Sequence, residues 1–233
     1  MSPTLAARRR PVPLAVAVVI AVLAGLLTFT LPSGPAHAAG HARHSHGQVT
    51  GLPTARQVAF HDAMRKLWED HVTWTRLAIV TFAAKTQGFD ATATRLLQNQ
   101  TDIGNAIAPF YGTAAGDKLS ALLHDHITIA VKIMQDVRAS DSSALAQDEA
   151  RWYANANDIA DFLHAANPRF WPDATLRAAM KEHLDQTLAE ASDELAGHYA
   201  ASVSDYEAIH LHILAMADLL SSGIMHQFPA RFR

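Results

Sequence analysis

Cysteine is absent from this sequence of 233 residues. Its absence excludes disulfide scaffolds, thiolate nucleophiles, thiolate zinc sites and iron–sulfur clusters. The chain also lacks a glycine-rich phosphate loop, a G-x-G-x-x-G fingerprint, a Gly-x-Ser-x-Gly elbow and any basic run of five residues. These absences argue against nucleotide cofactors, serine hydrolysis and nucleic-acid binding. An apolar fraction of 49% is nevertheless sufficient for a substantial core.

The first 38 residues are typical of an export signal. Arg8 to Arg10 form a positive start, Leu14 to Leu31 is an uncharged apolar run of 18 residues, and Pro35 to Ala38 supplies the small residues of a cleavage site. We expect cleavage after Ala38 and a secreted or cell-wall location. The alternative is an uncleaved membrane anchor, because 18 apolar residues just reach across a bilayer. The cleaved chain keeps all 22 acidic and 16 of 19 basic residues, for a net charge of −6.

Cleavage after Ala38 would create a second, independent metal motif. The new chain would begin Ala39-Gly40-His41, and an amine, two amides and a third-position imidazole suit the tetragonal preference of Cu(II) or Ni(II). The surrounding segment, residues 39–53, is small, polar and rich in histidine, which predicts a disordered lead-in. A cut one residue later would abolish the motif.

Beyond residue 53, apolar residues recur at intervals of three and four, which is typical of helices that bury one face. Thr54, Asp173 and Ser204 are suited to cap helix starts, whereas Gly88 and Pro168 mark helix ends. No window shows the alternation of a strand. The predicted fold is an all-α, antiparallel up-and-down helical bundle, a single domain over 54–229, with long helices at about 54–87, 114–138, from the 140–143 cluster to 166, 173–199 and 204–226, and short helical segments at 90–99 and 102–108.

Histidine is present in excess, with 14 residues. One leaves with the predicted signal peptide and three lie in the lead-in. Of the ten others, four fall on the apolar stripes of four different helices: His71, His126, His183 and His210. The remaining six are predicted to be solvated: His61, His124, His164, His198, His212 and His226.

Further polar side chains share these stripes or their edges. At one depth they would satisfy one another or bind an ion, since each unpartnered buried polar group costs about 1–3 kcal/mol. Imidazoles and carboxylates without thiolates suit zinc, copper, iron or manganese. The predicted metal ligands are His71, His126, Asp158, His183, Glu190, Glu207 and His210, with Asn155, Thr187 and Tyr206 in support. A purely hydrogen-bonded polar core is the alternative. A bridged di-iron centre is only weakly indicated, because a Glu-x-x-His pair occurs once.

Several runs carry a resemblance to a known family. They are LWEDHVTWTR from Leu67, LLQN from Leu96, PFYG from Pro109, WYANA from Trp152 and QFP from Gln227. With them the chain resembles, over residues 57–229, a family of small bacterial helical proteins without settled function, inconsistently labelled glycosyltransferase or acetylglutamate kinase. The resemblance implies a helical bundle. The residues support neither label, because the chain lacks an Asp-x-Asp pair, a phosphate loop and an α/β pattern.

Three functions are compatible with the sequence. The leading hypothesis is an exported binding protein that holds a transition-metal ion or a small polar ligand in the bundle core. The second is an enzyme that uses the same cluster as an acid/base pair or to activate a metal-bound water. The third is a structural or partner-binding bundle whose polar core fixes the helix register. No nucleotide cofactor is expected, and contact with a membrane is expected only if the N-terminal apolar segment is retained.

Overall fold

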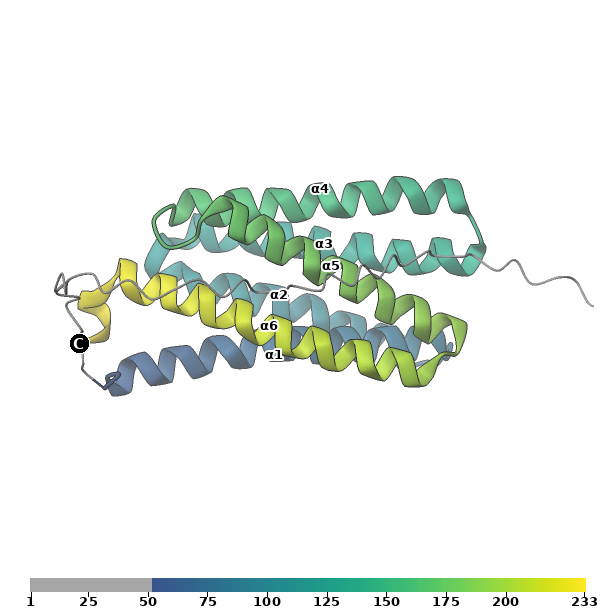
Figure 1. The fold of residues 1–233 in the computed structure, drawn as a ribbon, viewed down its shortest axis with the longest axis horizontal. Coiled ribbons are helices and arrows are strands. Elements are labelled where there is room, and N and C mark those ends of the chain that lie inside the picture. The colour runs from purple at the N-terminus through teal and green to yellow at the C-terminus, as the bar shows by residue number, and fades with distance from the viewer. Residues whose placement is uncertain (1–51) are drawn as a thin grey trace, which may run out of the picture. The chain divides into compact units, whose positions relative to one another are not determined.

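The computed structural model describes residues 52–233, which form six α-helices and a short 3₁₀ helix (Figure 1). No strand occurs among these residues, so the predicted all-α class is confirmed. The helices are α1 (Ala55–Ala83), α2 (Phe89–Tyr111), α3 (Thr113–Ala139), α4 (Ser142–Ala166), α5 (Asp173–Ala196) and α6 (Tyr199–Gln227), followed by η1 (Pro229–Phe232).

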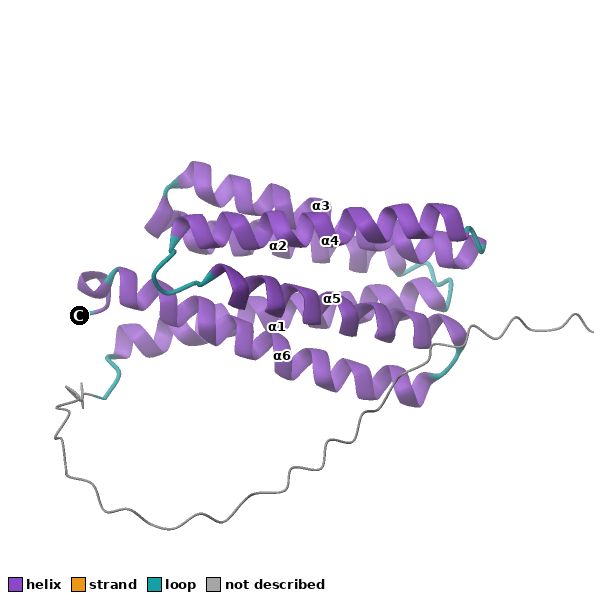
Figure 2. Cartoon of the chain, turned by 45° about the horizontal axis from the view of Figure 1, so that its top comes forward, coloured by secondary structure: helices purple, strands orange, loops and turns teal. Residues whose placement is uncertain are grey.

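The helices alternate in direction and close into a ring. Each helix packs against the next along the chain, and α6 returns to pack against α1 (Figure 2). Helix α5 also contacts α1 and α3, so its buried face looks into the interior. This arrangement confirms the predicted antiparallel up-and-down bundle, and it directs α1, α3 and α5 toward a common centre.

Local sequence signals set several helix ends. Thr54 and Gln57 form a capping box, in which the Thr54 hydroxyl accepts from the Gln57 amide at 3.2 Å and the Gln57 side chain accepts from the Thr54 amide at 2.8 Å. Asp141 caps α4 by accepting from the Ala144 amide at 3.0 Å. Gly112 and Gly197, at φ values of 90° and 79°, allow the sharp reversals before α3 and α6.

The structure differs from the sequence prediction over residues 89–111. Two short helical segments were predicted there, but a single helix, α2, spans the region and brings the number of long helices to six. Asn99 does not interrupt the helix, because its side chain is buried and donates to the Leu67 carbonyl oxygen at 3.0 Å. Pro109 lies inside the last turn of α2 rather than ending it.

Two further helix ends also differ. Helix α1 ends at Ala83, before the predicted end at residue 87, and Lys85 follows with a φ of 53°. Helix α6 begins at Tyr199, ahead of the predicted cap Ser204, because Gly197 in the left-handed conformation reverses the chain at once. Among the described residues, α6 is the one helix long and apolar enough to cross a bilayer, yet residues such as Ile213 and Ile224 on it are fully buried in the bundle.

Candidate functional site

Three imidazoles meet in the interior of the bundle, one each from α1, α3 and α5. His71 and His126 are 3% exposed and His183 is 5% exposed. The ring centroids of His71 and His183 lie 5.7 Å apart, and those of His126 and His183 lie 6.3 Å apart. We call these three side chains the histidine core. The helical period predicts that all three are buried. The packing of the six helices around the bundle brings them to the same depth along its axis.

His126 is held in place by α4. The Asn155 Nδ2 donates to the Leu122 carbonyl oxygen at 3.0 Å, which leaves Asn155 Oδ1 to accept from His126 Nδ1 at 2.8 Å. The Trp152 ring lies against the same imidazole, with centroids 5.1 Å apart. The hydrogen bonds therefore assign the proton of neutral His126 to Nδ1 and leave Nε2 with a free lone pair.

His71 contacts Gln100 of α2, a residue that is not among those predicted from the sequence. Gln100 is fully buried, and its Nε2 lies 2.8 Å from the Leu96 carbonyl oxygen and 3.3 Å from His71 Nδ1. The amide is thus placed to donate to both acceptors. Recognising α2 as one continuous helix would have revealed Gln100, which follows the buried Leu96 by one turn.

Three polar atoms of this region are buried without a hydrogen-bond partner in the described residues: His183 Nδ1, Gln100 Oε1 and Trp68 Nε1, whose ring centroid lies 5.9 Å from that of His71. Leaving a buried polar atom unpaired costs about 1–3 kcal/mol. Such atoms in an otherwise bonded group mark a position where a further partner would be favourable.

The histidine core is uncharged at neutral pH. Burial, together with the nearby His126, lowers the pKa of His71 to about 3. Burial lowers the pKa of His126 to about 4. Burial and the neighbouring imidazoles, His71 first among them, also hold the pKa of His183 well below its usual value. All three rings therefore keep a lone pair, which is the form that binds metal ions.

His212 of α6 packs against the histidine core, contrary to the sequence prediction. It was predicted to be solvated, but its side chain is only 12% exposed and its ring centroid lies 6.3 Å from that of His183. Its Nε2 lies 2.9 Å from the Ala179 carbonyl oxygen, and its Nδ1 lies 3.7 Å from Glu182 Oε1 at the surface. His212 therefore connects the histidine core to the outside of the bundle.

His210, which the sequence predicted as a ligand where the structure has His212, lies away from the histidine core. Its Nε2 is 3.1 Å from Glu69 Oε1, on the outer side of the α1–α6 contact, and the Tyr206 ring stacks on it at 5.9 Å. Asp158 and Glu207 are exposed. The phase of α6 is difficult to assign from sequence because apolar residues occur nearly all around it. The predicted site residues His210, Tyr206, Asp158 and Glu207 therefore lie outside the histidine core.

Glu190 is buried, but in a separate ion-pair network. It is 1% exposed, and Arg76 Nη1 lies 3.1 Å from its Oε1. Arg76 also pairs with Glu194 at 3.2 Å, and the Ser202 hydroxyl donates to Glu194 at 2.7 Å. Burial raises the pKa of Glu190 to about 7, although Arg76 opposes the rise. Arg76, Glu194 and Ser202 were not predicted, and the network holds α1, α5 and α6 together.

Between residues 52 and 233, no three His, Asp or Glu side chains already stand as a ligand set for one metal ion. The predicted seven-residue cluster is thus reduced to three imidazoles with Asn155 in support, while Thr187 lies one turn along α5 from His183, its hydroxyl donating to the His183 carbonyl oxygen at 2.8 Å. The predicted copper motif at Ala39, Gly40 and His41 lies outside the described residues.

Comparisons with protein-family models, with curated proteins and with solved structures found no match. The arrangement of the side chains is therefore the basis for a functional proposal.

Proposed function

We propose that the protein binds a transition-metal ion through the histidine core, with His71, His126 and His183 as ligands. The carrying observation is the group of three neutral imidazoles from three helices in which His183 Nδ1 lacks a partner. No carboxylate is needed for the proposed site, since imidazole alone suits zinc, copper, iron and manganese to different degrees.

The ring separations are close to those of a shared ion but larger. With a zinc–nitrogen bond of about 2.0–2.1 Å, two imidazoles in a tetrahedral site have ring centroids about 5.2 Å apart. The observed separations are 5.7 and 6.3 Å, so the rings would have to approach one another by about 0.5–1 Å to share an ion. The rings must still turn their nitrogens toward one point, which explains why no ready ligand set is present.

The surroundings would support such a turn. Asn155 orients His126 by accepting a hydrogen bond from Nδ1, which leaves Nε2 for an ion. Metal-bound histidines are commonly oriented by such a bond from the ring nitrogen that does not bind the metal. If the Gln100 amide turned over, its Oε1 would accept a hydrogen bond from His71 Nδ1 and leave His71 Nε2 as a ligand, at the loss of the present bond from Gln100 Nε2 to the Leu96 carbonyl oxygen. His212 and Glu182 would offer an ion a first contact near the surface.

The test is a titration of the purified, tag-free protein with Co²⁺ followed by visible absorbance, with zinc competition and metal analysis. We expect one ion per chain, loss of binding in His183→Leu, and unchanged binding in His226→Leu, which removes an exposed imidazole at the end of α6. A His41→Ala variant removes the predicted N-terminal copper motif, so that any metal it still binds must be bound elsewhere. Because the ligands are already neutral, affinity should hold from pH 7.5 to pH 6, whereas a site of exposed histidines would weaken. Binding that survives in His183→Leu but disappears in His41→Ala would refute the proposal.

A structural role for the polar core is the second candidate. It is favoured by the bonds of His126 to Asn155 and of His71 to Gln100, which link α3 to α4 and α1 to α2. It predicts no metal uptake and a loss of stability on removal of any of the three imidazoles. The enzymatic alternative stays a hypothesis.

We also propose export of the chain, on the basis of the N-terminal residues alone. N-terminal sequencing of the protein from its native source tests the expected cut after Ala38 and, with it, the existence of the copper motif.

A further inference from the structure

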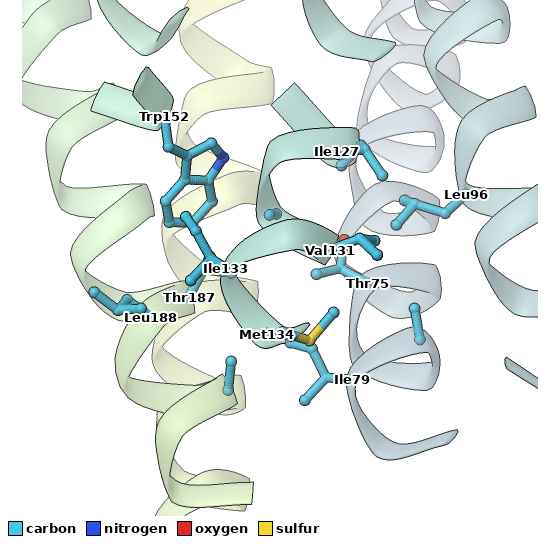
Figure 3. A pocket seen from close by; sticks show the side chains of 13 residues that line it. Thr75, Ile79, Leu96, Ile127, Val131, Ile133, Met134, Trp152, Thr187 and Leu188 are labelled. Carbon is cyan, nitrogen blue, oxygen red and sulfur yellow. The ribbon is translucent and has the colours of Figure 1, made fainter. Parts of the chain in front are cut away.

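A cavity of about 40 Å³ lies in the bundle, one helical turn from the histidine core, and Figure 3 shows the side chains that line it. Its wall is almost entirely apolar, with Leu96, Ile127 and Met134 among the side chains that line it. Room for one water requires only about 10–15 Å³, so the cavity is large enough to hold a small molecule.

The polar side chains of the wall are turned away from the cavity. The Thr75 hydroxyl donates to the His71 carbonyl oxygen at 2.7 Å, and the Thr187 hydroxyl donates to the His183 carbonyl oxygen at 2.8 Å. Trp152 Nε1 likewise donates to the His126 carbonyl oxygen at 3.1 Å. A buried water needs two to four polar partners, which this wall does not offer. The cavity is therefore expected to stay dry.

The same three hydrogen bonds show where the cavity lies relative to the imidazoles, because each joins a lining residue to the carbonyl oxygen of a core histidine. Thr75 and Thr187 each follow a core histidine by four residues, or about 6 Å along a helix. The cavity thus lies about one helical turn from His71 and His183, while Trp152 contacts both the cavity and the His126 ring.

Small residues set the size of the cavity. Ala78 on α1, Ala130 on α3 and Ala191 on α5 line it, and a larger side chain at such a position would fill the space. Three facing helices thus each leave room one helical turn from the histidine core.

We propose that this cavity is a binding site for a small apolar molecule, in the size range of dioxygen to xenon, held next to the histidine core. An apolar protein cavity of about 150 Å³ stays dry and binds benzene or xenon. The smaller volume here limits the ligand to a molecule of one or a few atoms. The inference does not rest on metal binding, because the cavity wall is complete in the absence of an ion.

The test uses xenon as the probe, on metal-free protein with ¹³C-labelled methyl groups. We expect saturable xenon-dependent shifts of the methyl signals of Ile133, Met134 and Leu96, with little change elsewhere. Ala191→Leu should abolish these shifts by filling the cavity from α5, and Ala78→Leu should do so from α1 if the first variant folds poorly. Ala154→Leu adds the same side chain at an exposed position of α4 and serves as the matched control.

Absence of saturable shifts in the parent protein would overturn the proposal, as would shifts that persist in a folded filling variant. Nuclear Overhauser contacts between the lining methyls and a long-lived water would also overturn it, because they would show a hydrated cavity. Since no ion is present, these outcomes are independent of the Co²⁺ titration.

Discussion

The pH dependence of the free energy of unfolding tests the state of the histidine core, and His71→Gln is the perturbation that isolates it. The pKa of His71 is about 3 in the folded protein and about 6.5 in an unfolded chain. Between these values the unfolded chain binds a proton that the folded protein does not, so the stability contributed by neutral His71 falls as the pH falls below about 6.5. At pH 5 the loss is about 2 kcal/mol, because 1.5 pH units at about 1.36 kcal/mol each separate pH 5 from 6.5.

The measurement is urea unfolding of the parent protein and of His71→Gln at pH 7.5, 6 and 5, followed by tryptophan fluorescence. Glu190 acts in the opposite direction, since its pKa of about 7 lies above the unfolded value and its contribution grows as the pH falls from 7 toward 4.5. Both proteins contain Glu190, so its effect cancels in their difference.

The stability difference between parent and variant should therefore shift by about 2 kcal/mol in favour of His71→Gln between pH 7.5 and pH 5. His226→Gln, at an exposed position, controls for the loss of an imidazole as such. A difference that stays constant with pH to within about 0.5 kcal/mol would mean that His71 is not buried in its neutral form.

Two further predictions concern buried polar groups. Arg76→Met leaves Glu190 and Glu194 buried without their cation and should cost about 3–5 kcal/mol at pH 8 in urea unfolding. The cost should be smaller at pH 6, where Glu190 takes up a proton, and an equal cost at both pH values would contradict the assignment. His183→Leu removes the unpartnered Nδ1 and should leave the metal-free protein unchanged or stabilise it by about 1–2 kcal/mol, which thermal melting would measure. A large loss of stability would favour the structural role of the core.

The fold and three of the site residues were predictable because the helical period identifies a buried face without any knowledge of the neighbours. His71, His126 and His183 follow apolar residues at three- or four-residue spacing, and the buried Trp68, Leu122 and Met180 lie on the same faces. Asn155 was found in the same way. In each of these helices the opposite face is polar, so the sequence indicates only one face that can be buried.

The other residues depend on information that a single helix does not contain. His212 and His210 are both compatible with the apolar pattern of α6, and only the packing of α6 against α5 selects His212. Glu190 was correctly placed on the buried face, but its depth along α5 brings it level with Arg76 rather than with His183. Sequence period gives the direction of a side chain, whereas its level depends on where each helix starts and on how the loops set the register.

The unpartnered atoms of the histidine core are the observation on which the proposed metal site and its structural alternative differ. A polar group kept only to fix helix register is expected to satisfy its hydrogen bonds, because an incompletely bonded buried group is less favourable than an apolar side chain of the same size. His126 meets this expectation through Asn155, but His183 Nδ1 and Gln100 Oε1 do not. The three rings, moreover, are uncharged over the physiological pH range, so they offer lone pairs without a competing proton. The proposed binding site therefore requires a ligand that completes the core at these atoms, whereas the structural alternative requires that they stay unpaired at a cost of about 1–3 kcal/mol each.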